Sequence, residues 1–167
     1  MSATDREPRW LTASELAAWL PLGGLLLKLP AALDAQMQQD SGLSHFEYLV
    51  LANLSEAPGR TRRMSALAAL ANGSLSRLSH VVKRLEARGW VRRQPCPQVG
   101  RYTNAVLTDA GYAKVVASAP GHVDAVRTLV LDALSGDELD RLGDIARRVL
   151  DRLDGDVRDA GGQATGG

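Results

Sequence analysis

The sequence predicts a mainly α-helical protein with six helices and one β-hairpin. Aromatic residues make up only 4% of the 167 residues, so the core must consist mostly of Leu, Val and Ala, which favours helices. The helix-start pattern Ser/Thr-x-x-Glu begins at Thr12, Ser44 and Ser135, each time before an apolar-periodic segment. After Gly89 the spacing of apolar residues changes from that of a helix to that of strands.

The first two helices are expected at residues 13–40 and 45–56. Pro21 and Pro30 lie inside the first helix. Each lacks an amide donor and crowds the preceding turn, so the sequence predicts a kinked or interrupted helix there. Gly42 ends the first helix, and the run Ala57-Pro58-Gly59 ends the second.

Two shorter helices follow at residues 65–71 and 74–88, joined by Asn72-Gly73. This short link lets the two helices cross steeply, as a helix-turn-helix requires. Each helix has one apolar face with members three or four residues apart. The inward residues are expected to be Leu67 and Leu70 on the first of the two, and Leu75, Leu78, Val82 and Leu85 on the second.

A β-hairpin is predicted next, with strands at residues 90–94 and 103–107 around a turn-rich loop at 95–100. Thr108 then caps a fifth helix, which Pro120-Gly121 should kink or break, and a sixth helix spans about residues 137–153. The last residues, 155–167, are rich in small side chains and are expected to form a disordered tail.

The charge is strongly separated along the chain. Residues 60–101 contain ten basic residues and one acid, Glu86, which gives this segment a net charge of +9, whereas the rest of the chain carries −8. A basic middle on a neutral body is typical of a nucleic-acid-binding surface. The simpler alternative is a solvated surface that happens to be rich in arginine.

The helix at 74–88 carries most of the candidate DNA contacts. With its leucines and Val82 turned inward, the outer face displays serines, a histidine and basic residues, and an α-helix of this kind fits the major groove of B-DNA. The residues expected to contact bases are Ser76, Arg77, Ser79 and His80, while Lys83 and Arg84 are expected to contact bases or phosphates. A surface helix whose long side chains only shield the core is the alternative interpretation.

The hairpin supplies further candidates. Arg101 follows Gly100 at the tip of a narrow loop, which suits insertion into the minor groove, where the negative potential is deepest. Arg92 and Arg93 lie on the first strand, where alternate side chains point to opposite faces. The complete set of predicted DNA-binding residues also includes Ser65, Ser74 and Thr103.

Taken together, residues 64–93 resemble the winged helix-turn-helix of the MarR family of transcriptional regulators, and residues 100–111 resemble the wing of that family and the helix start that follows it. The resemblance covers about residues 10–154. The sequence departs from the family pattern at Pro21-Leu22-Gly23-Gly24, where relatives commonly keep a continuous helix, and at two further positions. Val99 stands where the wing usually carries an acid, two residues before Arg101, and Lys83 stands where an acid usually precedes Arg84.

The resemblance implies a cytoplasmic, homodimeric repressor that binds a palindromic site in double-stranded DNA. It also implies four segments: an N-terminal dimerisation helix (1–43), the winged helix-turn-helix (44–107), C-terminal dimerisation helices (108–154) and the tail (155–167). Half-sites should lie about one turn of DNA apart. The alternative is a winged-helix module that binds another protein and no specific DNA.

The same resemblance implies that a small aromatic or phenolic ligand releases the DNA. The candidate ligand-binding residues are Leu16, Trp19, Leu26, His45 and Tyr48. Large aromatic residues at helical spacing are more often part of the core, which is the alternative interpretation of this set. Cys96, between two prolines and near Arg93 and Arg101, raises a redox-sensing hypothesis, because cationic neighbours lower the pKa of a thiol.

Other functions find little support in the sequence. The single cysteine excludes an intrachain disulfide, and no arrangement of residues indicates a catalytic or phosphate-binding site, so neither an enzyme nor a metal or other cofactor is expected. The N-terminus has no apolar signal segment, and the apolar stretch at 16–33 is expected to be too interrupted to span a membrane. A cytoplasmic location is therefore expected.

Overall fold

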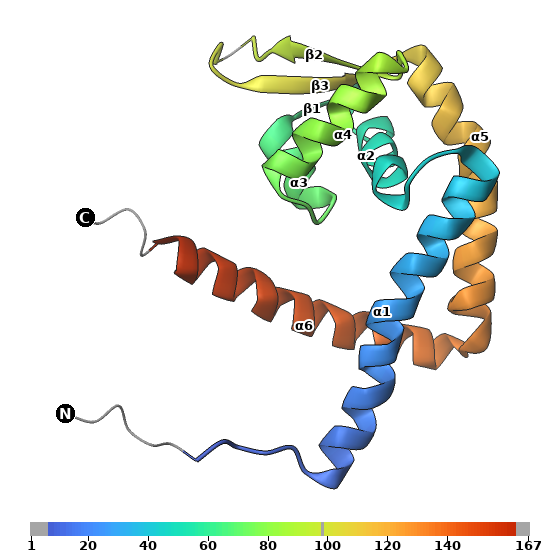
Figure 1. Ribbon diagram of the computed structural model, residues 1–167, viewed down its shortest axis with the longest axis vertical. Helices are drawn as coiled ribbons and strands as arrows, with labels where there is room; N and C mark the ends of the chain where they lie inside the picture. The colour runs from blue at the N-terminus through green and yellow to red at the C-terminus, as the bar shows by residue number, and fades with distance from the viewer. Residues whose placement is uncertain (1–6, 98, 163–167) are drawn as a thin grey trace. The chain divides into compact units, whose positions relative to one another are not determined.

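The computed structural model describes residues 7–97 and 99–162. It contains two units, which divide between Ala125 and Val126, within α5 (Figure 1). The elements are α1 (Ala13–Ser41), α2 (His45–Ser55), η1 (Pro58–Arg60), β1 (Thr61–Arg63), α3 (Met64–Leu70), α4 (Leu75–Ala87), β2 (Val91–Pro95), β3 (Thr103–Leu107), α5 (Asp109–Leu129), η2 (Leu131–Ala133) and α6 (Gly136–Gly162). The predicted fold class, six helices with a small antiparallel sheet, is confirmed.

The three predicted helix starts are confirmed by their hydrogen bonds. At Ser44 the hydroxyl accepts from the amide of Glu47 (3.1 Å), and a carboxylate oxygen of Glu47 accepts from the amide of Ser44 (2.8 Å). The same reciprocal pair begins α1 at Thr12 and α6 at Ser135. Each pair satisfies two amides that the helix itself leaves without acceptors.

Of the predicted kinks or interruptions at proline, the interruptions are wrong. Helix α1 runs without a break through Pro21 and Pro30, and α5 runs through Pro120. A proline leaves the carbonyl four residues earlier without its usual donor. The residues at those positions, Ala17, Leu26 and Val116, are exposed in this chain, so water can satisfy their carbonyls.

The continuity of α1 also changes the conclusion about its apolar stretch. Helix α1 has 29 residues, and its most apolar 18-residue window has a mean hydropathy of 1.6 with only 6% of the window buried. It is therefore long and apolar enough to cross a membrane by length and composition, contrary to the expectation that the prolines prevent this. Its exposed apolar side chains are those of Leu16, Trp19, Leu20, Leu22, Leu25, Leu26 and Leu27.

The sheet has three strands in the order β1-β3-β2, all antiparallel. Strands β2 and β3 form the predicted hairpin, with Val91 opposite Leu107 and Pro95 opposite Thr103. The third strand, β1, was not predicted, because the sequence Thr61-Arg62-Arg63 is too short to show an alternating pattern. It fixes the entry to α3, which begins at the next residue.

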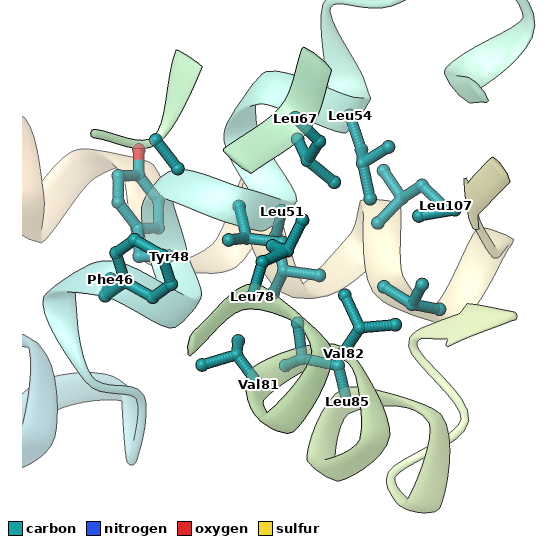
Figure 2. Close-up of a cluster of buried hydrophobic side chains, with 14 of the residues drawn as sticks. Phe46, Tyr48, Leu51, Leu54, Leu67, Leu78, Val81, Val82, Leu85 and Leu107 are labelled. Carbon is teal, nitrogen blue, oxygen red and sulfur yellow. The ribbon is translucent and has the colours of Figure 1, made fainter. Parts of the chain in front are cut away.

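The core lies among α2, α3, α4 and the sheet (Figure 2). Leu51, Leu78 and Leu85 are fully buried, and burial of each such side chain stabilises the fold by roughly 1.5–3 kcal/mol. On α4 the predicted inward face is correct except at two positions: Leu75 is 52% exposed and Val81 is buried. On α3, Leu67 is buried as predicted, whereas Leu70 is 48% exposed and the prediction for it is wrong. Leu75 is the first residue of α4, where the helix has not yet reached the core.

The second unit contains the end of α5, η2 and α6. Helix α6 has an apolar row at helical spacing that is exposed within this unit: Leu142, Ile145, Val149, Leu150 and Leu153. Its backbone stays helical to Gly162, so the predicted helix end near residue 153 is wrong. Residues 163–167 lie outside the described residues.

Candidate nucleic-acid interface

Helix α4 presents the polar face that the sequence predicts. Ser76, Arg77, His80, Lys83 and Arg84 are exposed and Ser79 is half-buried. Ser74 caps the helix, since its hydroxyl accepts from the amide of Arg77 (3.1 Å). Because its hydroxyl already holds the helix start, this residue has a structural role in addition to its predicted role at DNA.

Arg77 lies in the first turn of α4 and is held by an aromatic ring of α2. Its guanidinium carbon lies 4.1 Å from the centroid of the Phe46 ring, within the range of a cation–π contact. The same ring fills the space at Gly73, where a Cβ atom would lie 2.6 Å from it. A larger residue at this position of the α3–α4 turn would therefore displace the Phe46 ring of α2 that supports Arg77.

Arg84 is tied to the buried carboxylate of Glu47. The Nε atom of Arg84 donates to Oε1 of Glu47 (3.0 Å), while the other oxygen of Glu47 caps α2 at Ser44. The side chain of Glu47 is only 5% exposed, whereas that of Arg84 is 56% exposed. This contact fixes α4 to the start of α2 and still leaves part of the guanidinium at the surface.

The two arginines of β2 have different surroundings. The backbone amide of Arg93 donates to the Glu86 carboxylate of α4 at 2.8 Å, and the Nε atom of Arg93 donates to it at 2.7 Å. Arg93 therefore connects the wing to the helix. Arg92 is exposed and donates to the amide oxygen of Gln94 (2.7 Å). Of the two, Arg92 keeps a guanidinium that no carboxylate of the described residues neutralises.

At the wing tip, Arg101 and Thr103 are exposed on either side of Tyr102. The guanidinium of Arg101 lies 5.5 Å from the centroid of the Tyr102 ring, and that of Arg63 lies 4.2 Å from it. Cys96 is 4% exposed, and its amide donates to the carbonyl of Tyr102 (2.7 Å). Burial of the thiol speaks against the redox-sensing hypothesis, because reactive cysteines are accessible.

A hollow of about 330 Å³ lies where the start of α3, the first turns of α4 and the wing meet. Predicted DNA-binding residues from all three elements line it: Ser65, Ser79, Arg93, Arg101 and Thr103. Arg63, Met64, Leu75 and Tyr102 complete the lining. Residues that are far apart in the sequence are thus brought to one surface.

The predicted ligand-binding residues do not come together. Leu16, Trp19 and Leu26 lie exposed on the N-terminal part of α1, whereas His45 and Tyr48 lie on α2 against His122 of α5. The ring centroids of Tyr48 and His122 are 4.6 Å apart. Sequence periodicity alone could not show that the two groups lie on different surfaces.

Burial perturbs this group of rings. It lowers the pKa of His45, and the nearby His122 lowers it further, while Asp34 opposes the change. Burial also lowers the pKa of His122 and raises that of Tyr48. The neutral forms of both histidines are therefore favoured in the folded chain.

Of the five predicted ligand residues, His45 alone lines a groove in this region that has a volume of about 630 Å³. The groove lies among α1, α2 and the α3–α4 turn, and Leu29, Leu33, Asp34, Phe46 and Arg77 are among its lining residues. Trp19 instead lines a separate, shallow apolar surface with Leu11 and Leu22.

Sequence reasoning missed three residues that organise this interface: Phe46 beneath Arg77, Glu47 beneath Arg84, and Tyr102 between Arg63 and Arg101. Phe46 and Glu47 follow a helix cap, and the sequence pattern does not distinguish them from ordinary helix residues. Tyr102 gave a usable signal, because it is an aromatic residue directly after the basic tip of a wing.

Comparison with known proteins gives concordant results. A profile of the MarR family matches residues 41–101. The crystal structure of Sco3205, a MarR family transcriptional regulator from Streptomyces coelicolor, in complex with DNA, superposes with a TM-score of 0.85 at 46% identity, covering 87% of this chain and 92% of that one. AbsC, a MarR family transcriptional regulator from the same organism, gives 0.84 at 36% identity, covering 89% and 99%. Transcriptional repressor MprA of Escherichia coli (strain K12) is 26% identical over 119 residues, which is 71% of this chain and 67% of that protein.

Proposed function

This chain belongs to the MarR family of transcriptional regulators, and we propose that it is a repressor that binds a specific palindromic site in double-stranded DNA as a homodimer. The family consists of regulators and not of enzymes. The observation that carries the proposal is the convergence of α3, α4 and the wing on one surface that is rich in arginine and hydroxyl groups.

The contacts follow from the position of each element. The exposed face of α4 enters the major groove, where Arg77 binds a base edge and Ser76, Ser79 and His80 lie close to the bases. Arg101 at the wing tip faces the minor groove. The flanking residues Ser65, Lys83, Arg84, Arg92 and Thr103 bind or approach phosphates, while Ser74 and Arg93 hold α4 and the wing in place.

A second copy of the chain explains the uncovered apolar surfaces. The exposed leucines of α1 and the apolar row of α6 form apolar patches, and an isolated soluble chain usually displays smaller ones. In a homodimer these surfaces are buried against the partner, and we propose that the protein is a soluble regulator of the cytoplasm. A two-fold dimer reads two half-sites about one turn of DNA apart.

A small aromatic or phenolic ligand is the proposed signal for release, and the groove beside His45 is the proposed site. Arg77 contributes to the wall of this groove, so an occupant changes the surroundings of a DNA-binding side chain. Titration of the protein–DNA complex with benzoate and with phenol tests this part. A loss of DNA binding that Leu33→Trp abolishes supports the site, whereas no response to either compound contradicts the proposed ligand class.

The function is tested by selection from a pool of random duplexes with the full chain, followed by sequencing of the retained DNA. An enriched palindrome is the expected result. Absence of any enriched sequence contradicts sequence-specific binding and favours the alternative, a winged helix that binds another protein.

A further inference from the structure

Tyr102 occupies a fixed position in the wing. Its amide donates to the carbonyl of Val99 (2.9 Å), and its carbonyl accepts from the amide of Cys96 (2.7 Å). Both bonds lie within the hairpin loop, so the backbone around Tyr102 is held on both sides. Its side chain is partly exposed and faces the hollow between the wing and the helices.

Two guanidinium groups from different elements share the Tyr102 ring. Arg63, the last residue of β1, lies 4.2 Å from the ring centroid, and Arg101 of the wing lies 5.5 Å from it. The negative face of an aromatic ring attracts a guanidinium, and contact with it restricts the rotamers of a long side chain. Both cations therefore lie within contact range of one ring.

These two cations differ from three of the arginines near them. Arg60, Arg84 and Arg93 each have a carboxylate partner, whereas among the residues that the structure describes no carboxylate pairs with Arg63 or Arg101. Two guanidiniums that share one ring and have no counter-charge favour binding of an anion. The serine and threonine hydroxyls of the same hollow are donors for its oxygens.

We propose that Tyr102 is a positioning residue, which holds Arg63 and Arg101 as a pair against one stretch of DNA. Arg101 faces the minor groove, and Arg63 binds the adjacent backbone phosphate. This inference rests on the proposed DNA-binding function and adds Arg63 and Tyr102 to the interface. It also assigns the support of Arg101 to an aromatic ring, since position 99 is a valine and offers no carboxylate.

The proposal is tested with the full chain and a fluorescein-labelled 30-bp duplex of random sequence, by anisotropy at several salt concentrations. Two single variants are needed: Tyr102→Leu keeps apolar bulk, and Tyr102→Phe keeps the ring. The other two are the double variant Arg63→Ala/Arg101→Ala and the triple variant that adds Tyr102→Leu to it. Tyr102→Leu should weaken binding by about three- to tenfold. The same variant should also make the salt dependence shallower, by about the contribution of one phosphate contact. Tyr102→Phe should stay within about twofold of the parent.

The decisive comparison is between the two backgrounds. When Arg63 and Arg101 are already alanine, Tyr102→Leu should have no further effect, because the ring then has no guanidinium to position. If Tyr102→Leu lowers DNA affinity equally in the parent chain and in the double alanine variant, the proposal is overturned. General damage to the fold would appear as such an equal loss. Wild-type affinity for Tyr102→Leu, or an equal defect in Tyr102→Phe, also overturns it. If the unchanged chain binds no duplex at all, the failure lies in the proposed function itself.

Discussion

At the scale of single residues, Arg77 is the side chain on which sequence readout depends most. It is the first basic residue of α4, it is exposed, and Phe46 limits the positions that its guanidinium can take. Arginine donates two hydrogen bonds to guanine, and each such contact is worth roughly 1–3 kcal/mol of discrimination.

Arg77→Ala should therefore lower the affinity for the selected site by about ten- to a hundredfold and lower the affinity for random DNA much less. Anisotropy titrations with both duplexes measure the difference. Arg9→Ala is the matched control, because it removes the same charge from a side chain that is 95% exposed and outside the interface. An equal loss for both duplexes would show that Arg77 binds only phosphate.

The second prediction at this scale concerns His122. Its pKa is lowered in the folded chain because the ring is buried, and Nδ1 has no hydrogen-bond partner among the described residues. The unfolded chain therefore binds more protons than the folded chain between the lowered pKa and the ordinary value of 6.5. The stability that the neutral ring contributes is complete above about pH 6.5 and is lost as the pH falls through that window.

Thermal unfolding at pH 7.5, 6.5 and 5.5 should show a fall in Tm toward low pH that is smaller in His122→Gln. His80→Gln alters an exposed histidine of α4 and should keep the pH dependence of the parent. An unchanged pH profile in His122→Gln would assign the acid sensitivity to other groups, of which His45 is the nearest.

At the scale of elements, the connection between α2 and α4 depends on Glu47. The structure offers a comparison among three capping boxes of the same pattern, at Glu15, Glu47 and Glu138. Glu47 alone of the three is buried and bound to an arginine of another helix. The cap and the contact between helices can therefore be separated experimentally.

Glu47→Ala should lower the free energy of unfolding by about 1–3 kcal/mol, since it removes the acceptor for the Ser44 amide and leaves Arg84 unpaired. Half-exposure of Arg84 keeps the cost below that of a fully buried ion pair. Urea unfolding followed by circular dichroism measures it. Glu15→Ala and Glu138→Ala should each cost less, and equal costs in all three would mean that the contact with Arg84 adds nothing.

The elements were predictable from sequence where a local signal existed. Ser44 and Ser135 marked helix starts correctly because a capping box is formed within four residues. The breaks expected at Pro21 and Pro120 did not occur, and the exposed carbonyl that each proline leaves without a donor can bind water instead.

The interface was predictable only as a list of exposed residues. Its positive charge and hydroxyl groups are visible in the sequence, whereas the support of each arginine is not. Phe46 lies 31 positions before Arg77 and Arg63 lies 39 positions before Tyr102. Such contacts depend on how helices cross and how strands pair, which local patterns do not encode. The same reason explains why the sequence did not show that His45 and Trp19 line separate hollows of the chain.

At the scale of the whole molecule, the account requires that the exposed apolar face of α1 be covered by a second copy. Leu27 is 78% exposed and Leu26 is 59% exposed, so neither supports the fold of a single chain. Replacing both with glutamate should therefore leave the winged helix folded and weaken the dimer by at least tenfold.

Sedimentation equilibrium over a range of concentrations measures this dissociation. Leu70→Glu is the control, because Leu70 is an exposed leucine of α3 at 48% and lies within the winged helix. A dimer that is as tight in the α1 variant as in the control would contradict a dimer interface on this part of α1.

The measurement that tests the central claim most directly is the salt dependence of binding to the selected duplex. With about five phosphates bound at each site, the logarithm of the association constant should fall against the logarithm of the salt concentration with a slope of about −4 to −5. The duplex should also keep its preference over a scrambled one at every salt concentration. A flat dependence with no preference between the two duplexes would contradict DNA recognition by this basic surface.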